Sequence, residues 1–322
     1  MSRTEPPETV SFASDTDDRA LDALADALYS PDDGRAEAVE AVRTLAAVDP
    51  ETAAALVDPL VAVTTAAVPD AQAATRRAAS PALVRIGRAH PETLAPHADA
   101  LAALVAAEDE GLAENAAGVC AALAEVRPDA VAAVRDALLA VTDAGDHAAS
   151  VDALDALAAV AADDPGAVRP ALDRLCAHLD ADRPAVAAAA CRALAPLAST
   201  EADRIAAHDD RLAALLDCDR AECRAAAGRT LARTLPFAPT GLPESRERAV
   251  GLLDDGTPSV RRAGADAVVS LAQTEPGAFE EPREVAAALA DARATLPLDD
   301  RSEAAVGEAL ALLGRPTPAP RR

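Results

Sequence analysis

Cysteine and histidine are residue types that bind metal ions and take part in catalysis, and their spacing in this sequence is loose. Cys176 and His178 are two residues apart, and Cys218 and Cys223 are five apart. A structural zinc site needs tightly spaced ligand pairs that occur twice, and a second close pair is missing. Free cysteine is more often a small buried apolar residue. We therefore predict that these cysteines are core residues, and we assign no metal ligand.

Motifs for phosphate binding or covalent catalysis are also missing. The 14 glycines are scattered singly, and no GxxxxGK[ST], GxGxxG or GxSxG motif occurs. Paired carboxylates stand at expected turns and helix starts, where they cap N-termini and interact favourably with the helix dipole. These pairs are Asp32-Asp33, Asp163-Asp164, Asp209-Asp210 and Asp299-Asp300. We predict that the chain is not an enzyme and uses no cofactor.

The composition predicts an all-α protein. Hydrophobic residues make up 51% of the chain, but aromatic residues make up only 1%. Alanine and leucine favour helices, whereas the β-favouring aromatic residues are nearly missing. Small aliphatic side chains suit thin layers of closely packed helices, so the 322 residues are better explained by a long repeat array than by two globular domains.

The charge is strongly acidic. The chain has 54 acidic residues and 30 basic residues, all of them arginine, for a net charge of −24. Molar salt would screen this self-repulsion, so the composition resembles that of proteins from extreme halophiles. A GC-rich genome would also explain the missing lysine, but it would not explain the acidic excess.

The N-terminal segment, the apolar runs and the cysteines indicate the cellular compartment of the protein. Residues 1–17 are polar and acidic, without the basic start and apolar core of a secretory signal. No apolar run approaches the ~20 residues that span a bilayer. Five cysteines without framework spacing suit a reducing compartment. We predict a cytoplasmic protein with a disordered acidic tail at 1–17, a solenoid at 18–316 and a short disordered tail at 317–322.

A repeat of 37 residues runs through the chain. A proline turn recurs after each expected pair of helices, and the positions 91, 128, 165, 239 and 276 are 37 or 74 residues apart. Ala202 takes the midpoint of the longer gap, and Pro50 lies 41 residues before Pro91. We call these positions the anchors of the repeat. Repeats of this length indicate a stacked array, because one unit cannot bury its apolar stripe alone.

Side chains follow the same period. Eight residues before each anchor stand apolar residues of one column: Val42, Leu83, Cys120, Leu157, Leu194, Leu231 and Val268. Twelve residues before stands a column of small residues: Ala38, Ala79, Ala116, Ala153, Ala190, Ala227 and Gly264. Offsets three or four residues apart form one stripe of a helix. We therefore predict that this stripe of the second helix of each unit is buried, and that another helix crosses closely at the small residue.

Two antiparallel helices per unit, a proline in the first helix, and a second helix opening with Asp and then Val-Arg resemble HEAT repeats. The clearest copy runs from Asp254 to Arg262, and weaker copies begin at Asp182 and Asp219. The resemblance covers about residues 18–316 and implies a right-handed α-α superhelix of about eight helix pairs. The armadillo family is the nearest competitor, but its third helix needs room that we expect this period to lack.

The resemblance implies a protein–protein interaction scaffold or adaptor. One alternative is a metal- or cofactor-associated HEAT-like enzyme or lyase accessory protein, but the His-Glu pairs of HEAT-like di-iron hydroxylases do not occur. A second alternative is a nucleic-acid-associated subunit. Base-flipping enzymes need aromatic side chains and a cationic groove, which four aromatic residues and a net charge of −24 do not supply.

One segment lacks the acidic excess. Residues 1–182 contain 33 acidic residues and 12 arginines, whereas residues 183–262 contain 11 and 12. Six arginines here lie off the expected buried stripe of the second helices: Arg192, Arg224, Arg229, Arg233, Arg261 and Arg262. Second helices line the concave face in HEAT-like solenoids, so we hypothesise that these arginines bind a protein with an acidic surface. Alternatively, they pair with acids of neighbouring helices such as Asp217, Asp219, Glu222 and Glu247.

Overall fold

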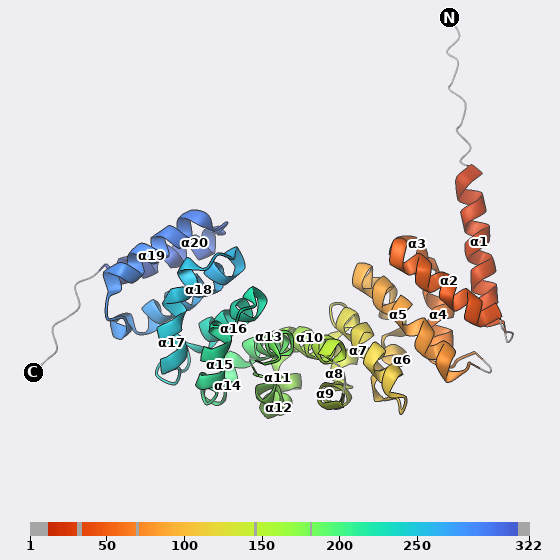
Figure 1. Ribbon diagram of the computed structural model, residues 1–322, viewed down its shortest axis with the longest axis horizontal. Coiled ribbons are helices and arrows are strands. Elements are labelled where there is room, and N and C mark those ends of the chain that lie inside the picture. The colour runs from red at the N-terminus through yellow and green to blue at the C-terminus, as the bar shows by residue number, and fades with distance from the viewer. Residues whose placement is uncertain (1–11, 31–33, 69–70, 145–146, 181, 315–322) are drawn as a thin grey trace, which may run out of the picture. The chain divides into compact units, whose positions relative to one another are not determined.

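The structure is a computed structural model that describes residues 12–314 apart from 31–33, 69–70, 145–146 and 181. Its described residues form helices and connecting turns without any strand. The chain divides into two compact units, residues 1–130 and 131–322 (Figure 1). Within the described ranges, no helix is both long enough and apolar enough to span a membrane.

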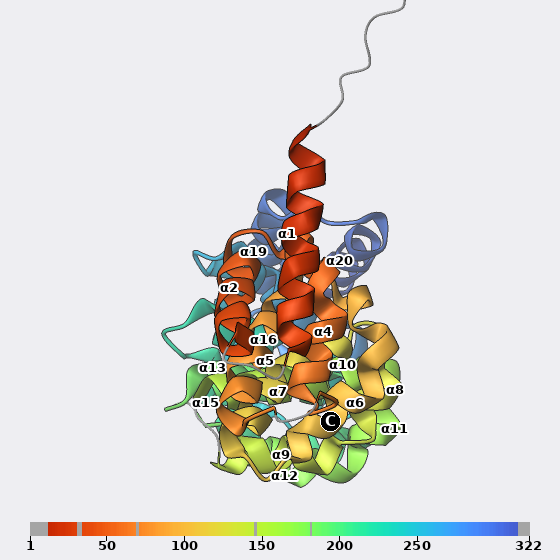
Figure 2. The ribbon, with the colours of Figure 1, turned by 90° about the vertical axis from the view of Figure 1, so that its right-hand side faces the viewer.

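The first unit packs long second helices against short opening segments. Its elements are α1 (Phe12–Tyr29), α2 (Gly34–Val48), α3 (Pro50–Ala53), α4 (Val57–Thr64), α5 (Ala73–Ala89), α6 (Ala98–Ala103) and α7 (Glu110–Leu123). Helix α1 lies beside α2 and α4 (Figure 2). It begins at Phe12, so residues 12–17, which we expected in the tail, are helical. The remaining predicted tail residues, 1–11 and 317–322, lie outside the described residues.

The second unit repeats the arrangement. Helix α8 (Pro128–Ala132) contains the boundary between the two units. The later elements of the second unit are α9 (Arg135–Ala144), α10 (His147–Asp163), α11 (Pro165–Val168), α12 (Leu172–Ala177), α13 (Pro184–Leu194), α14 (Ala198–Ala206), α15 (Asp209–Leu216), α16 (Ala221–Thr234), α17 (Pro243–Ala249), α18 (Pro258–Thr274), α19 (Pro282–Thr295) and α20 (Asp300–Leu313). The consecutive second helices α10, α13, α16 and α18 pack side by side.

The columns read from the sequence form the core. Every residue eight before an anchor is fully buried, from Val42 to Val268. The alanines twelve before an anchor, from Ala38 to Ala227, are buried as well. A methyl group on Gly264 would lie 2.6 Å from Leu252 Cβ and 3.0 Å from the Leu252 carbonyl carbon. The predicted stripe and the close crossing at its small residue are therefore confirmed.

Several first helices are broken into two segments, which we did not expect from the sequence. In the unit that begins at Pro165, α11 ends at Val168, a 3₁₀ turn follows over Arg169–Ala171, and α12 begins at Leu172. Pro170 lies at this break, because proline lacks an N–H and its ring clashes with the preceding turn. An opening helix of four or five residues leaves room for three helical segments in 37 residues. The 37-residue period therefore does have room for an armadillo-like third helix, contrary to our expectation.

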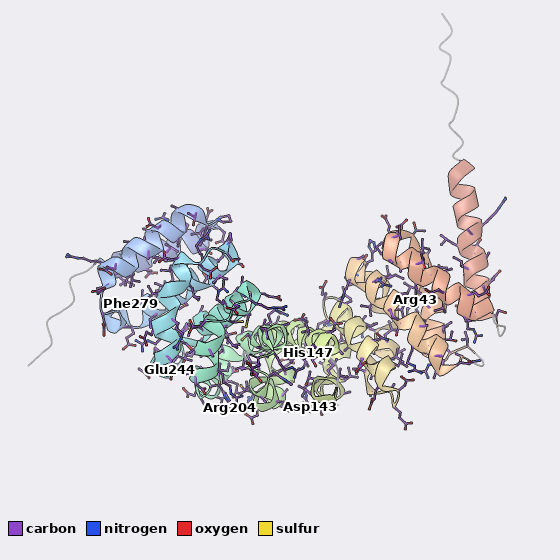
Figure 3. All side chains as sticks on the ribbon, viewed as in Figure 1. Arg43, Asp143, His147, Arg204, Glu244 and Phe279 are labelled. Carbon is purple, nitrogen blue, oxygen red and sulfur yellow. The ribbon has the colours of Figure 1, made fainter. Side chains whose placement is uncertain are left out.

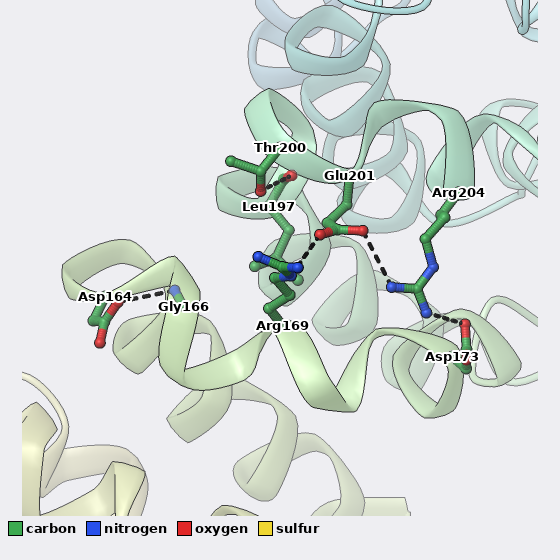
Figure 4. A network of polar contacts seen from close by, with 8 residues as sticks. All are labelled: Asp164, Gly166, Arg169, Asp173, Leu197, Thr200, Glu201 and Arg204. Atoms are coloured by element: carbon green, nitrogen blue, oxygen red, sulfur yellow. Dashed lines mark hydrogen bonds and ion pairs between the residues drawn. The ribbon is translucent and has the colours of Figure 1, made fainter.

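The unit around Ala202 lacks an anchor proline and is divided by a kink. Helix α13 continues through a 3₁₀ turn into α14, where Glu201 departs from helical geometry with φ −126° and ψ 24°. The Glu201 carboxylate is 10% exposed and lies between Arg169 Nε at 2.8 Å and Arg204 Nη1 at 3.1 Å (Figure 4). Arg204 also contacts Asp173 at 2.6 Å, so this network joins two successive units.

Aspartates cap several helix starts. Asp164 accepts a hydrogen bond from Gly166 N–H, and Asp299 accepts one from Ser302 N–H. Asp209 reaches into the next unit, where its two oxygens accept from the N–H groups of Glu244 and Ser245 at 2.7 and 3.0 Å. The predicted capping role is therefore confirmed for these three residues, while Asp32 and Asp33 lie outside the described residues.

Candidate functional site

The six predicted arginines occupy different positions in the repeat. Arg224 and Arg261 stand fifteen residues before their anchors, at the start of the second helix. Arg35 and Arg76 take the equivalent position in the first unit, where they donate to the backbone carbonyls of Leu28 and Thr64. Arginine at this position therefore holds the chain that precedes the second helix.

Arg224 is the most extensively bonded of the six. It donates to the carbonyl oxygens of Cys218 and Asp219 at 2.7 and 3.0 Å, and its Nη2 lies 2.7 Å from Asp255. Burial opposes ionisation of Asp255, but the Thr257 N–H and the Arg224 guanidinium outweigh it and lower its pKa. Arg261 donates to the backbone carbonyl of Asp255 at 2.8 Å. The side chains of both arginines are thus engaged within the fold.

Arg192 and Arg262 form ion pairs with neighbouring helices. Arg192 lies 2.6 Å from Asp155 on α10 and 3.2 Å from Glu222 on α16. Arg262 lies 3.6 Å from Asp299 and donates to the carbonyl oxygen of Pro297. For these arginines the pairing alternative describes the geometry, although Glu222 is the one acid of the four we named that pairs by its side chain with any of the six.

Arg229 and Arg233 differ from the other four. Both are exposed on α16, one helical turn apart, and neither makes a hydrogen bond or an ion pair with any residue that the structure describes. Partial desolvation and the nearby Arg192 lower the pKa of Arg229. We call Arg192, Arg229 and Arg233 the arginine ridge.

Small residues on the buried side of α16 let this helix pack closely against α13 and α18. A methyl group on Gly228 would lie 2.9 Å from Ala263 Cβ on α18. On the other side, the Thr230 hydroxyl donates to the carbonyl of Cys191 on α13 at 2.9 Å. Because the helices approach so closely, side chains 37 residues apart become neighbours, as Asp155 and Arg192 do.

Asp266 completes this row of charges, and we did not select it from the sequence. It stands in the same column as Asp155, Arg192 and Arg229, ten residues before its anchor, and this shared register was the signal available. Burial raises the pKa of Asp266, and the nearby Arg262 and Arg229 oppose the shift. Asp266 therefore adjoins the unpaired cations without neutralising them through a direct contact.

Four of the five cysteines lie in the core as predicted, whereas Cys218 does not. Cys120, Cys176, Cys191 and Cys223 are buried, and Cys218 is partly exposed. Burial raises the pKa of the Cys120 thiol to about 12 and that of Cys176 to about 11, so both stay protonated. His178 contacts the Thr142 hydroxyl at 2.9 Å and His97 contacts Asp58 at 2.8 Å. Within the described part of the chain, no three His, Cys, Asp or Glu side chains are grouped to hold a metal ion.

Sequence comparison yields no relatives for this chain. No protein-family description matches it, and no curated protein matches it.

Structural comparison does yield neighbours. An engineered protein of known crystal structure has a TM-score of 0.72 and 21% identity, over 93% of this chain and 80% of its own. A structure from a study of a phosphorylation switch in the cadherin and beta-catenin interaction has a TM-score of 0.66 and 14% identity; the match covers 90% of this chain and 60% of that one. A designed armadillo repeat protein in complex with the peptide (KR)4 has a TM-score of 0.52 and 18% identity, over 67% and 99%. At these identities the likeness concerns the fold, and the chain therefore has the fold of an armadillo- and HEAT-like helical-repeat solenoid.

Proposed function

We propose that this chain is a non-enzymatic scaffold or adaptor whose arginine ridge binds an acidic segment of a partner protein. The observation that carries the proposal is the pair Arg229 and Arg233, which are exposed and make no ion pair or hydrogen bond within the described structure. Unpaired guanidinium groups one helical turn apart present the forked donors that suit carboxylates.

The charge around the ridge supports an anionic ligand at this place. Residues 183–262 carry as many arginines as the 1–182 segment, with a third of its acidic residues. An extended acidic partner would be repelled by the other segments of a chain of net charge −24. Repulsion is weakest at residues 183–262, where arginines balance the acidic residues. The same net charge opposes nucleic acid as a partner, because a phosphate backbone needs a broad cationic surface.

An exposed aromatic side chain follows the ridge closely in the sequence. Phe237 follows Arg233 by four residues, just beyond the end of α16, and is 56% exposed. Solvent-exposed aromatic side chains are frequent anchors of protein interfaces. We therefore expect the partner segment to combine carboxylates with an apolar residue.

The structural neighbours are consistent with a scaffold. One is named for the interaction of cadherin with beta-catenin, and another holds a peptide. The cytoplasm remains our proposed location, because buried free cysteines suit a reducing compartment.

The test is charge reversal at the two unpaired arginines. A fluorescein-labelled peptide of alternating glutamate and leucine is titrated with the wild-type chain and with the variant Arg229→Glu/Arg233→Glu, with fluorescence anisotropy as the readout. Loss of two exposed ion pairs should weaken binding by about tenfold or more.

The matched control is Arg283→Glu/Arg301→Glu, which reverses two exposed arginines of α19 and α20 that make no described ion pair. It changes the net charge equally and should leave the affinity within about twofold. Equal loss in both variants, or no loss in the ridge variant, would contradict the proposal. Affinity purification from the native host, at its own salt concentration, would then identify the partner.

A further inference from the structure

A cavity of about 620 Å³ opens between α17 and α19 in the second unit. Its apolar wall contains Leu271, Val250 and Val285, together with Phe279, which is labelled in Figure 3. Its rim carries Glu247, Glu280 and Glu281, together with Arg246. The volume is typical of pockets that bind small ligands or anchoring side chains.

The cavity results from an irregularity in the last repeat. Phe279 stands where earlier units place Val168, Ile205 and Leu242, all of which are fully buried. Val168 and Ile205 lie in helices and Leu242 adopts φ −128° and ψ 51°, whereas the turn Pro276–Ala278 ends at an extended Phe279 with φ −96° and ψ 129°, and α19 begins only at Pro282. The Phe279 ring is therefore left partly exposed at the cavity instead of being enclosed.

The rim carries net negative charge, because its one arginine is already paired and two of its glutamates are not. Arg246 donates to the Pro239 carbonyl at 2.9 Å and lies 3.1 Å from Glu275, so its charge is already neutralised. Glu247 and Glu280 are exposed and make no ion pair or hydrogen bond with any described residue. The hydrogen bond and the negative charge of Glu284 raise the pKa of the exposed Glu281, so these two carboxyl groups lie close together.

We infer that this cavity is a docking site for an extended segment of a partner protein in which an arginine or lysine stands next to a large aliphatic residue. The aliphatic side chain packs against Phe279, Val250 and Val285. The cation lies among Glu247, Glu280 and Glu281, and its stem can cover the Phe279 ring, whose face attracts cations. The site is separate from the arginine ridge, and its ligand has the opposite charge.

The probe is the fluorescein-labelled peptide Gly-Ser-Arg-Leu-Arg-Leu-Gly-Ser, titrated with the full chain and followed by anisotropy. Two further peptides replace both leucines by serine or both arginines by glutamate. We expect the serine peptide to bind about tenfold more weakly, because its apolar contact with the cavity is lost. The glutamate peptide is titrated with the Arg229→Glu/Arg233→Glu variant, in which the arginine ridge cannot bind it, and we expect no binding to that variant. Equal binding of the leucine and serine peptides would overturn the inference, because attraction to net negative charge alone would explain it.

The variant Glu247→Arg/Glu280→Arg should weaken binding of the arginine–leucine peptide by about tenfold. Both side chains are exposed, so the fold should be retained, and circular dichroism checks this. The control Glu108→Arg/Asp291→Arg reverses two exposed acids that do not line the cavity. Equal weakening by the control, or no binding by the wild-type chain, would also overturn the inference.

Discussion

Two arginines of α16 show how position in the repeat decides the role of one residue type. Arg224 is 19% exposed and contacts Asp255, which is 13% exposed, as well as two loop carbonyls. Arg233 is exposed and makes no such contact within the described residues. The first contributes to stability and the second is available for binding.

Replacing Arg224 by methionine should therefore lower the free energy of unfolding by about 2–3 kcal/mol, because it leaves a nearly buried carboxylate and two carbonyls without their donor. Urea unfolding followed by circular dichroism measures this change. Arg233→Met serves as the control and should stay within about 0.5 kcal/mol of wild type. A stable Arg224→Met would show that the loop is held by other contacts.

Asp266 gives a pH dependence of defined sign. Burial raises its folded-state pKa, so the folded protein binds its proton more tightly than the unfolded chain does. The resulting stabilisation is fully present below the unfolded pKa and is lost as pH rises through the folded pKa. Asp266→Asn should therefore match wild type in acid and become the more stable protein towards neutral pH. Urea midpoints of both proteins across the acidic range test this, and a constant difference would contradict it.

At the scale of elements, α18 lies so close to the turn at Leu252 that position 264 has no room for a side chain larger than that of glycine. Alanine normally favours a helix over glycine by about 1 kcal/mol. Gly264→Ala should nevertheless destabilise the protein by about 1–3 kcal/mol, because the new methyl group would meet Leu252 Cβ at 2.6 Å and backbone atoms at 3.0 and 3.2 Å.

Gly307→Ala on α20 is the matched case, since a methyl group there has no neighbour within 4 Å. It should raise stability by up to about 1 kcal/mol. Thermal and urea unfolding of the two variants should move in opposite directions. A shift in the same direction would mean that helix propensity, and not the crossing, dominates at Gly264.

The elements also show which features could be predicted from sequence. The core columns were predictable, because burial recurs at a fixed position in the units from Val42 to Val268. Helix boundaries were less predictable: α1 begins earlier than expected, and two first helices are broken near Pro59 and Pro170. Asp209 was recognisable as a cap, but its partners Glu244 and Ser245 belong to the next unit and required the packing. Arg229 and Arg192 share one column of the repeat, but only Arg192 forms ion pairs. The acids that pair with Arg192 lie on neighbouring helices, so the sequence position alone could not distinguish the two arginines.

For the molecule as a whole, the net charge of −24 predicts stability that rises with salt. Between about 0.1 M and about 1 M salt the Debye length falls from about 10 Å to about 3 Å, which screens repulsion among the acids. Exposed pairs such as Arg248 and Asp217 weaken at the same time, but each contributes little. We therefore expect the urea midpoint to rise with potassium chloride concentration. A flat or falling midpoint would show that the ion pairs outweigh the repulsion, and it would remove the basis for the halophile interpretation.

The regular spacing of contacts has a mechanical consequence. Polar contacts between successive units join residues about one repeat apart, as Arg192 with Asp155 at a separation of 37 and Gln273 with Glu308 at 35. A pulling force on a chain end therefore has to break one inter-repeat interface at a time. Each step would release about 37 residues, or about 120–130 Å of extended chain. In an optical trap, either compact unit should lengthen in a series of nearly equal steps and shorten again as the repeats restack.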